Sequence, residues 1–432
     1  MIRSRRRHFG FFAAVLLLLA MAHPAAADVS PGDVIDKSNS EKVEGLVPAS
    51  FINMLKNGEI VLNIGKLNYD PGEISRSLVS KTITENAGKY GIKDRQIIDV
   101  QTGKLPDFVE GLPFPRNDQA DPDFGLKFMI NREYFQLSQG NLDFPFHFIF
   151  VTPKGFDREA FGMYYQDPMD GFAEAKSLPN PDKISRYQMF VFKQPYDIAG
   201  TSQMTWRYRG AEQDLNCAFL PSIRRVRRLT PANRSDGIIG SDFCYDDAWG
   251  YDGKPSDFEW KLIKKGEGIL PFLSEDVQTL EATKDGGWQT PKNIKAVVYG
   301  YQKPGWTGAK WFPTNMVWVK RPVVVFEIHS RDPYYNYGVQ YMWMDAEAPI
   351  ATIRDMHDRS GQYWKTMVAS SGAFETPDKK IRLNGLTTQE VLDSRSKRCT
   401  IVEDSSPRNQ WKYFVKGDIN KYSMGGYAKF CQ

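Results

Sequence analysis

The feature that most constrains the fold is a run of alternating apolar and polar residues near the middle of the chain. Met204, Trp206 and Tyr208 share one face of this run. The other face carries Gln203, Thr205, Arg207 and Arg209. Alternation with period 2 predicts a strand with one buried face in an antiparallel sheet. A Gly-containing turn follows, then a strand at Cys217–Leu220 and an arginine-dense strand between Pro221 and Pro231, so this region is predicted to be a meander of strands.

Helices are predicted mainly towards the N-terminus. Pro48 can open a helix over Ala49–Lys56, and the Asn-Gly pair that follows can close it. A second helix is expected over Ile74–Glu85, and residues 105–125, rich in Pro, Gly and Asp, are expected to cross the molecule in extended form. A short helix towards the C-terminus is predicted after Thr387, because its Thr-x-x-Glu spacing is that of a capping box.

From Phe124 onward the sequence predicts strands. Besides the meander, they are expected at Phe144–Val151, Gln188–Phe192, Phe258–Ile263, Ala296–Tyr301, Met316–Lys320, Val323–His329 and Val339–Met344. The run Val323–Ile328 is almost wholly apolar, which predicts a strand covered on both faces. The chain has 27 Phe, 20 Tyr and 10 Trp, which favours β structure with a large apolar interior. The predicted fold is mainly β: a large curved antiparallel sheet with a few helices packed in or against it.

The N-terminal end has the pattern of a secretory signal peptide. Arginines at positions 3, 5, 6 and 7 precede the apolar run Phe11–Ala22, and alanines at 25–27 end it. We expect cleavage after Ala27, export to the periplasm, and no lipid anchor because no cysteine lies near the site. Residues 28–432 are then predicted to form a single domain. Its parts are a helical and extended segment at 28–123, and an antiparallel sheet with a C-terminal helix at 124–432.

The charge balance gives no indication of nucleic-acid binding. The chain holds 56 Lys+Arg and 52 Asp+Glu, and four of the arginines lie in the predicted signal peptide, which leaves 52 of each in the remainder. Equal numbers of basic and acidic residues give no indication of the basic surface that nucleic-acid binding requires. No metalloprotease, phosphate-loop or nucleophile-elbow motif occurs, so the sequence predicts no catalytic residue, metal or cofactor. His147 and His329 are read as structural histidines.

Four cysteines, an even number, suit two disulfides in an oxidising compartment. Three pairings are possible. We favour Cys217–Cys244 and Cys399–Cys431, because each joins neighbouring segments of the chain. Four buried free thiols are the alternative, and a zinc site is not favoured because no C-x₂-C spacing exists.

Two charged groups and one apolar face each allow a structural and a functional interpretation. The first group consists of Arg224, Arg225, Arg227 and Arg228. These arginines either protect an edge strand by their charge, paired with later aspartates, or form a docking patch for anionic headgroups or a membrane partner. The aspartates at 242, 246, 247, 252 and 257 are read as turn caps that pair with nearby arginines; calcium is disfavoured because the ligand spacing is absent. The face of Met204, Trp206 and Tyr208 is either packed core or the wall of a ligand cavity.

Two stretches carry a family resemblance. The first is FLPSIRRVRR at 219–228, followed by GSDF at 240–243 and YDD at 245–247; the second is RPV at 321–323 with DP, YG and DAE at 332–347. Together they resemble the outer-membrane lipoprotein-sorting (LolA/LolB-like) superfamily, and within it a large periplasmic branch, DUF1329, a domain of unknown function. The resemblance implies an unclosed β-barrel whose mouth is plugged by helices around an apolar cavity. Cys217 and Cys244 depart together from the family pattern, which fits a bridge between them.

These observations lead to a functional hypothesis. The protein is predicted to be a periplasmic, non-catalytic carrier of a lipid or other hydrophobic molecule, as the resemblance implies, working with an inner-membrane transporter of the resistance-nodulation-division class or with an outer-membrane partner. The predicted ligand contacts are Met204, Trp206, Tyr208, Phe219, Phe326, Ile328 and Trp343. An adaptor subunit of an envelope complex is the first alternative, and a hydrolase of envelope lipid or glycan is the second, since a shared fold does not fix function.

Overall fold

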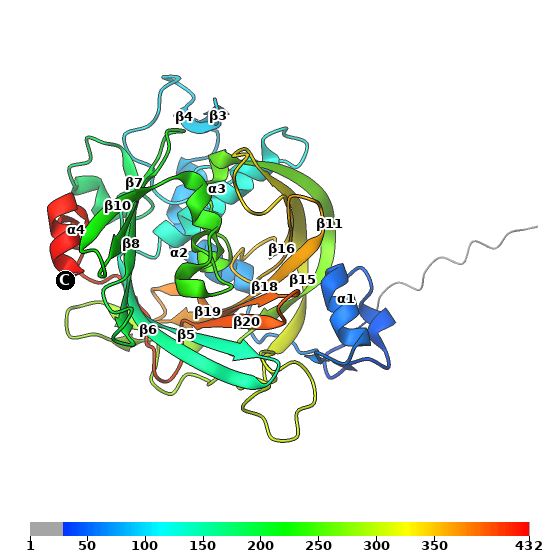
Figure 1. Cartoon of the computed structure of the whole chain (residues 1–432). Helices are drawn as coiled ribbons and strands as arrows, with labels where there is room; N and C mark the ends of the chain where they lie inside the picture. Colours follow the sequence, from blue (N-terminus) through cyan, green and yellow to red (C-terminus); the bar gives the residue numbers. More distant parts are fainter. Residues whose placement is uncertain (1–28, 432) are drawn as a thin grey trace, which may run out of the picture.

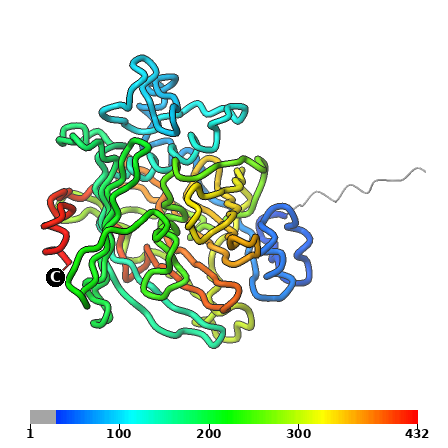
Figure 2. Tube along the Cα trace, turned by 45° about the horizontal axis from the view of Figure 1, so that its top comes forward, coloured from blue at the N-terminus to red at the C-terminus, as the bar shows by residue number. Residues whose placement is uncertain are grey.

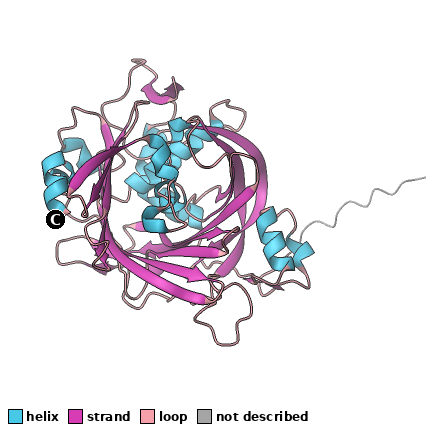
Figure 3. Ribbon diagram, viewed as in Figure 1, coloured by secondary structure: helices cyan, strands magenta, loops and turns pink. Residues whose placement is uncertain are grey.

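The computed structural model describes residues 29–431. The predicted signal peptide, residues 1–27, lies outside the described residues. The dominant feature of the described residues is one large antiparallel sheet that curves around the interior of the molecule (Figure 1, Figure 3). Pairing runs in the order β10–β9–β8–β7–β6–β5–β20–β19–β18–β17–β16–β15–β11. No pairing joins β10 to β11 within residues 29–431, so the sheet is not closed into a barrel.

The strands of this sheet are long. They are β5 (Leu142–Thr152), β6 (Gly155–Pro168), β7 (Ile184–Gln194), β8 (Ser202–Tyr208), β9 (Leu215–Leu220), β10 (Arg225–Leu229), β11 (Phe258–Phe272), β15 (Val317–Ser330), β16 (Val339–Asp345), β17 (Thr352–His357), β18 (Tyr363–Glu375), β19 (Arg382–Asp393) and β20 (Arg398–Glu403). Register shifts interrupt several pairs, including β6–β7, β7–β8 and β18–β19. Such bulges bend strands and raise their twist, which lets a sheet this wide curve back over its own face.

Short strands complete the β structure. They are β1 (Val34–Ile35), β2 (Leu62–Asn63), β3 (Tyr90–Lys93), β4 (Gln96–Asp99), β12 (Gln278–Thr279), β13 (Glu281–Ala282), β14 (Trp288–Gln289) and β21 (Lys412–Tyr413). Residues 29–70 (blue in Figure 2) lie on one side of the molecule and join the main sheet where Gly65 N donates to Trp318 O at 2.9 Å. The ring of Phe51 packs edge-on against Trp318 at that junction, 5.5 Å between centroids.

Within residues 29–431 four α-helices lie among these strands: α1 (Ala49–Lys56), α2 (Pro71–Glu85), α3 (Phe124–Leu137) and α4 (Met424–Phe430). Helix α2 begins where the Asp70 carboxylate accepts from Gly72 N, and it packs against β19, where Asn384 Nδ2 donates to Pro71 O at 2.8 Å. Helix α3 lies inside the curve of the sheet (Figure 1) and approaches β11 so closely that a Cβ on Gly125 would lie 2.6 Å from Trp260 Cβ. A larger residue at position 125 would therefore separate the helix from the sheet.

A second segment fills the interior beside α3. We call residues 231–257 the plug segment; it consists of four 3₁₀ turns, η3 (Pro231–Ser235), η4 (Ile238–Gly240), η5 (Tyr245–Gly250) and η6 (Pro255–Asp257), and it spans the gap in sequence between β10 and β11. Ile239 and Trp249 both adopt positive φ, 47° and 61°. Two non-glycine residues in this conformation mark a backbone whose path is set by its packing rather than by local preference.

Most predicted elements are confirmed, with boundaries extended by a few residues. The helix at Ala49–Lys56 is exact, and the residues of Val323–Phe326 are buried on both faces as predicted. The strands expected at Met316–Lys320 and Val323–His329 are one strand, β15, which runs through Pro322. Residues 296–301 form no strand; Tyr299 makes an isolated bridge to Pro313 instead.

Two predictions about helices were wrong. Residues 124–137 form α3, which the sequence did not reveal because the helix is enclosed by the sheet and buries polar side chains such as Arg132 and Gln136 beside apolar ones. An enclosed helix has no exposed polar face and so lacks the amphipathic stripe. The helix predicted after Thr387 is part of β19, and the C-terminal helix is α4 instead. A capping-box spacing occurs by chance in strands rich in Thr and Glu.

Glu390 on β19 generates a stability prediction. The side chain is fully buried, Thr388 Oγ1 donates to its Oε1, and Oε2 has no hydrogen-bond partner within residues 29–431. Burial raises the pKa of Glu390 from 4.5 to about 8. Between these values the folded chain keeps a proton that the unfolded chain releases, so stability falls as pH rises through this window.

We expect Glu390→Gln to unfold at nearly the wild-type temperature at pH 5 and to be more stable than wild type at pH 8, by about 2–4 kcal/mol. Thermal denaturation followed by circular dichroism at both pH values measures this difference. Equal stability of the two proteins at pH 8 would contradict a carboxyl group that resists ionisation.

Candidate functional site

The interior of the curved sheet has an aromatic part and an ionic part, and the plug segment contributes to both. The aromatic part encloses a cavity of about 50 Å³. The cavity is lined by Phe144, Phe146, Phe148, Tyr164, Phe190, Ile238, Phe243, Tyr245, Ala248, Trp249, Leu386, Gln389, Val402, Asp404 and Trp411. These residues come from β5, β6, β7, β19, β20 and their flanks, with the plug segment closing the remaining side.

The alternation of β5 explains its contribution. Phe144, Phe146 and Phe148 are spaced by two and therefore project from the same face of the strand. His147, between them, points the other way: it stacks on Phe161 at 4.1 Å and lies 2.9 Å from Glu159. The same alternation was visible in the sequence, but without knowledge of which face is interior it did not identify the cavity.

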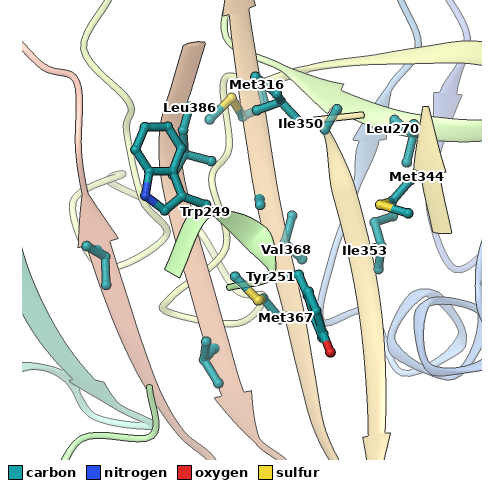
Figure 4. Close-up of a cluster of buried hydrophobic side chains, with 14 of the residues drawn as sticks. Trp249, Tyr251, Leu270, Met316, Met344, Ile350, Ile353, Met367, Val368 and Leu386 are labelled. Carbon is teal, nitrogen blue, oxygen red and sulfur yellow. The ribbon is translucent and has the colours of Figure 1, made fainter. Parts of the chain in front are cut away.

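Trp249 is the main contribution of the plug segment to the cavity. Its indole Nε1 donates to Tyr164 OH at 3.2 Å, and its ring meets that of Trp411 edge-on at 4.8 Å. Figure 4 shows Trp249 against Leu386 of β19, with further buried side chains along the neighbouring strands. Gly250 N donates to Gln389 Oε1 at 2.9 Å, which ties the backbone after Trp249 to the same strand.

The ionic part lies under the other half of the plug segment and is centred on Asp252. Its carboxylate pairs with Arg186 and, at 3.0 Å, with Arg234, and accepts from Gln188 Nε2 at 2.7 Å. Arg207 Nη2 donates to the carbonyl of Asp252 at 2.7 Å. Burial opposes ionisation of Asp252, but the three guanidinium groups outweigh it and lower its pKa.

Helix α3 joins the same network. Glu133 Oε1 lies 3.1 Å from Arg186 Nη1 and 3.1 Å from Arg207 Nη1. Arg132 donates to plug-segment carbonyls, including that of Tyr251 at 2.7 Å, and burial lowers its pKa to about 10. The sheet, the helix and the plug segment are thus held together by charges that are almost completely buried.

Two further aspartates of the plug segment pair with arginines. Asp246 lies 2.5 Å from Arg234 Nε and accepts from Tyr335 OH at 2.8 Å, while Asp247 pairs with Arg354 of β17. Four of the five aspartates expected to pair with nearby arginines do form such pairs: Asp246 and Asp252 with Arg234 of the same segment, and Asp242 and Asp247 with arginines of distant strands. Asp257 forms no ion pair within residues 29–431. Within residues 29–431 no group of three or more His, Cys, Asp or Glu side chains is arranged to hold a metal ion.

The structure places the predicted ligand contacts of the meander elsewhere. Met204, Trp206 and Phe219 project from the outer face of β8 and β9 into a separate cluster beneath α4. Trp206 Nε1 donates to Tyr422 O at 2.9 Å, and Met204 is fully buried. Tyr208, at the end of β8, is partly exposed. These side chains are therefore packed core and do not form the wall of the cavity, because the polar face of β8 is the one that turns towards the interior of the sheet.

The three contacts predicted from later strands also lie outside the cavity. Phe326 packs against Phe124 and Phe128 of α3, with ring centroids 6.1 and 5.5 Å away. Ile328 is fully buried in the main core. Trp343 pairs with Val325 rather than with Phe326, so it projects from the opposite face, where Lys264 Nζ lies 4.6 Å from its ring centre.

The arginine-dense strand is an exposed edge. β10 pairs with β9 alone in the described chain, and Arg224, Arg225, Arg227 and Arg228 are all exposed. None of the four forms an ion pair within residues 29–431, where the aspartates proposed as partners are occupied by other arginines. The interpretation as an edge strand is therefore correct, but the ion pairs expected between its arginines and the later aspartates do not form within residues 29–431.

The predicted disulfides Cys217–Cys244 and Cys399–Cys431 are absent, and all four cysteines are free and buried. Cys217 faces the cluster beneath α4, whereas Cys244 begins the plug segment's turn η5 in the interior. Cys399 lies in the middle of the sheet between Leu392 and Val151, while Cys431 Sγ is 3.0 Å from Ser202 Oγ on the outer face. Neighbouring positions in sequence lie on opposite sides of the sheet, which is why the pairing was wrong.

A wider cleft of about 430 Å³ lies between the plug segment and the residues at 330–335 that end β15 and follow it. Its lining is half polar and includes Arg234, Asp246, Lys254, Asp257, Arg331 and Asp332. Charged walls of both signs favour water over an apolar ligand. The enclosed aromatic cavity is therefore the better candidate site.

An unclosed antiparallel sheet that curves around a plug segment and an aromatic cavity defines a half-barrel fold. Residues 34–424 match the family described as "Protein of unknown function (DUF1329)", so the chain belongs to that family. The resemblance seen in the sequence is confirmed. No curated protein matches the chain.

Solved structures that resemble the chain include the following three. A candidate outer membrane lipoprotein-sorting protein domain from Vibrio parahaemolyticus is 15% identical, with a TM-score of 0.46 over 71% of this chain and 100% of that one. A DUF1329 family protein from Desulfovibrio piger is 15% identical, with a TM-score of 0.44 over 71% of this chain and 98% of that one. A LolA superfamily protein from Nitrosomonas europaea is 10% identical, with a TM-score of 0.37 over 66% of this chain and 91% of that one.

Asp247 generates a second prediction. It is the one carboxylate that pairs with Arg354 in the described chain, and both side chains are fully buried. Asp247→Asn leaves the Arg354 charge without a partner, and we expect it to destabilise the fold by about 3–5 kcal/mol, as broken buried pairs do.

The matched control is Glu267→Gln, which breaks an exposed pair with Lys320 at 3.5 Å and should change stability by less than about 0.5 kcal/mol. Urea denaturation of both variants measures the difference. Similar losses in the two would show that the plug segment is not anchored by this pair.

Proposed function

We propose that this protein is a non-catalytic carrier in the cell envelope that holds a hydrophobic ligand in the aromatic cavity. The observation that carries the proposal is the lining of the cavity: nine of its fifteen side chains are aromatic, and Gln389 and Asp404 are the polar groups besides the tyrosine hydroxyls. Apolar enclosures with a few polar groups are typical of small-molecule sites. Neither His147 nor His329 faces the cavity, and its lining offers no paired nucleophile and base.

Ligand entry requires the plug segment to move. A volume of about 50 Å³ is well below the 300–1,000 Å³ of typical ligand sites, so the structure corresponds to a closed state. The cavity side of the plug segment is apolar, and its other side is held by ion pairs. Each methylene buried on binding contributes about 0.8 kcal/mol, which offsets the work of displacing the plug segment for a ligand of sufficient length.

The envelope location is part of the proposal. The predicted signal peptide supports export to the periplasm, and no helix of the described residues is long and apolar enough to cross a membrane. The donor and acceptor of the ligand are membranes or membrane proteins, including a transporter of the resistance-nodulation-division class. An adaptor subunit remains the alternative function; it needs no ligand in the cavity.

The first test is native mass spectrometry, with organic extraction, of the protein purified from its own periplasm. We expect a co-purifying apolar molecule at about one per chain. Ala248→Phe fills the cavity from the plug segment and should reduce the bound fraction at least about tenfold, because overpacking leaves no room for the ligand.

The matched control is Trp206→Phe, which alters the cluster beneath α4 and should leave occupancy unchanged. Loss of the ligand in this variant, with retention in Ala248→Phe, would place the ligand beneath α4. A clean unliganded mass for wild type would favour the adaptor.

The exposed arginines of β10, together with Arg224 just before it, are proposed to dock on anionic lipid headgroups. Guanidinium groups grip phosphate, and these four have no competing partner in the described chain. Replacing Arg224, Arg225, Arg227 and Arg228 by Gln should reduce sedimentation with phosphatidylglycerol vesicles at least about tenfold, and wild-type binding should weaken as salt rises. Equal binding to phosphatidylcholine vesicles would contradict this role.

A further inference from the structure

The aromatic cavity has one polar corner, formed by β19 and the residue that follows β20. Gln389 Nε2 donates to Asp404 Oδ2 at 2.9 Å, and Gln389 Oε1 accepts from Gly250 N at 2.9 Å. These two bonds fix the orientation of the Gln389 amide, so that its nitrogen faces Asp404. The carboxyl group is held on the cavity wall by the same chain of contacts that ties down the plug segment.

Asp404 has no cationic partner. It is 3% exposed, and no Lys, Arg or His lies within ion-pair distance of it in residues 29–431. The titratable groups that act on it are all acidic or neutral: Glu390 of β19 and Glu403 of β20 beside it, with Tyr413 of β21 also within its field. Burial, and after it the two glutamates, raise its pKa well above the ordinary range, which favours the neutral acid when no cation is present.

The Asp404 carboxyl group is close to aromatic rings that suit a cation. Trp411 and Trp249 line the same cavity as Asp404. Phe144 covers one face of Trp411, 3.9 Å between centroids, so only ring faces that are not covered in this way can receive a cation. Aromatic faces attract ammonium groups, most strongly where water is excluded. A buried carboxylate beside such rings provides the two interactions that ammonium ligands use in proteins.

We infer that the cavity is selective for an apolar molecule that carries a single ammonium group, with Asp404 as its counter-ion and Gln389 as the residue that positions Asp404. This inference rests on the proposed function and adds the chemical class of the ligand. A carboxylate headgroup is disfavoured because Asp404, Glu390 and Glu403 supply only negative or neutral partners. A ligand hydroxyl group accepts one hydrogen bond from the Asp404 carboxylic acid but makes no use of the aromatic rings that attract a cation.

Binding of an ammonium ligand involves a proton transfer to solvent. The Asp404 carboxylic acid releases its proton to the buffer, the ammonium group keeps all of its protons, and the resulting ion pair is neutral overall. At any pH at which the unliganded protein keeps Asp404 protonated, one proton is released for each ligand bound. Affinity for the ammonium ligand consequently rises with pH, by up to about tenfold per unit, until Asp404 is ionised in the free protein as well.

The test compares three probes of equal chain length, octylammonium, 1-octanol and octanoate, by isothermal titration calorimetry on the chain from residue 28. Octylammonium should bind at least about tenfold more tightly than octanol, and octanoate most weakly. Asp404→Asn should reduce the preference for octylammonium over octanol to within about threefold while leaving octanol binding unchanged. The matched control is Asp143→Asn, which neutralises a half-buried carboxyl group outside the cavity lining and should keep the preference.

The wild-type protein provides a readout that does not depend on the folding of any variant. Titrations in phosphate and in Tris, which differ in ionisation enthalpy, should report release of about one proton with octylammonium and none with octanol. Equal affinities for the three probes without proton release would overturn the inference and leave cavity binding intact. Failure of all three to bind would instead overturn the proposed function.

Discussion

The buried carboxylate of Asp252 is the interaction on which the arrangement of the interior depends. Arg186 and Arg207 project from two neighbouring strands, Arg234 comes from the plug segment, and all three contact Asp252. A charge in this position is tolerable only when it is paired, because desolvation of an unpaired ion costs several kcal/mol. Each of the three segments therefore needs the others in place, and α3 is included through Glu133. This requirement specifies one position for the plug segment, although ion pairs of this kind contribute little net stability over apolar packing.

The same segment serves two purposes because its residues divide by chemistry. Its acidic side chains at 246, 247 and 252 hold it to the sheet, while Phe243, Tyr245 and Trp249 close the aromatic cavity. The plug segment also has aromatic contacts away from the cavity, where Tyr251 packs edge-on against Phe258 and Trp260 with ring centroids 5.6 and 5.2 Å apart. Ion pairs and aromatic packing together therefore fix its position.

The elements were easier to predict than the site, and the reasons can be seen in particular residues. Alternation located β8 and β5, and the helix over 49–56 has its start and stop signals in adjacent residues. Helix α3 had no such signal, because its surroundings are polar on one side and apolar on the other and both are buried. Thr387 and Glu390 have capping-box spacing, but the long-range pairing of β19 with β18 and β20 overrides this local preference. The disulfide pairing failed for a related reason, since nearness in sequence does not determine on which face of a sheet a cysteine lies.

By itself the sequence determined the β class, the family, the meander with its arginine-rich edge and the presence of an aromatic interior. The family follows from the resemblance of short motifs, and the other properties follow from composition and from periodicity within single segments, which are local. The tertiary structure alone decided which face of each strand is interior. It turned Met204 and Trp206 outward beneath α4, turned Arg207 inward to Asp252, and brought Phe144, Trp249, Gln389 and Asp404 around one cavity. The physical reason is that a strand offers two equivalent faces, and the choice between them depends on partners far away in the chain, 45 residues for Arg207 and Asp252 and 216 for Trp206 and Tyr422.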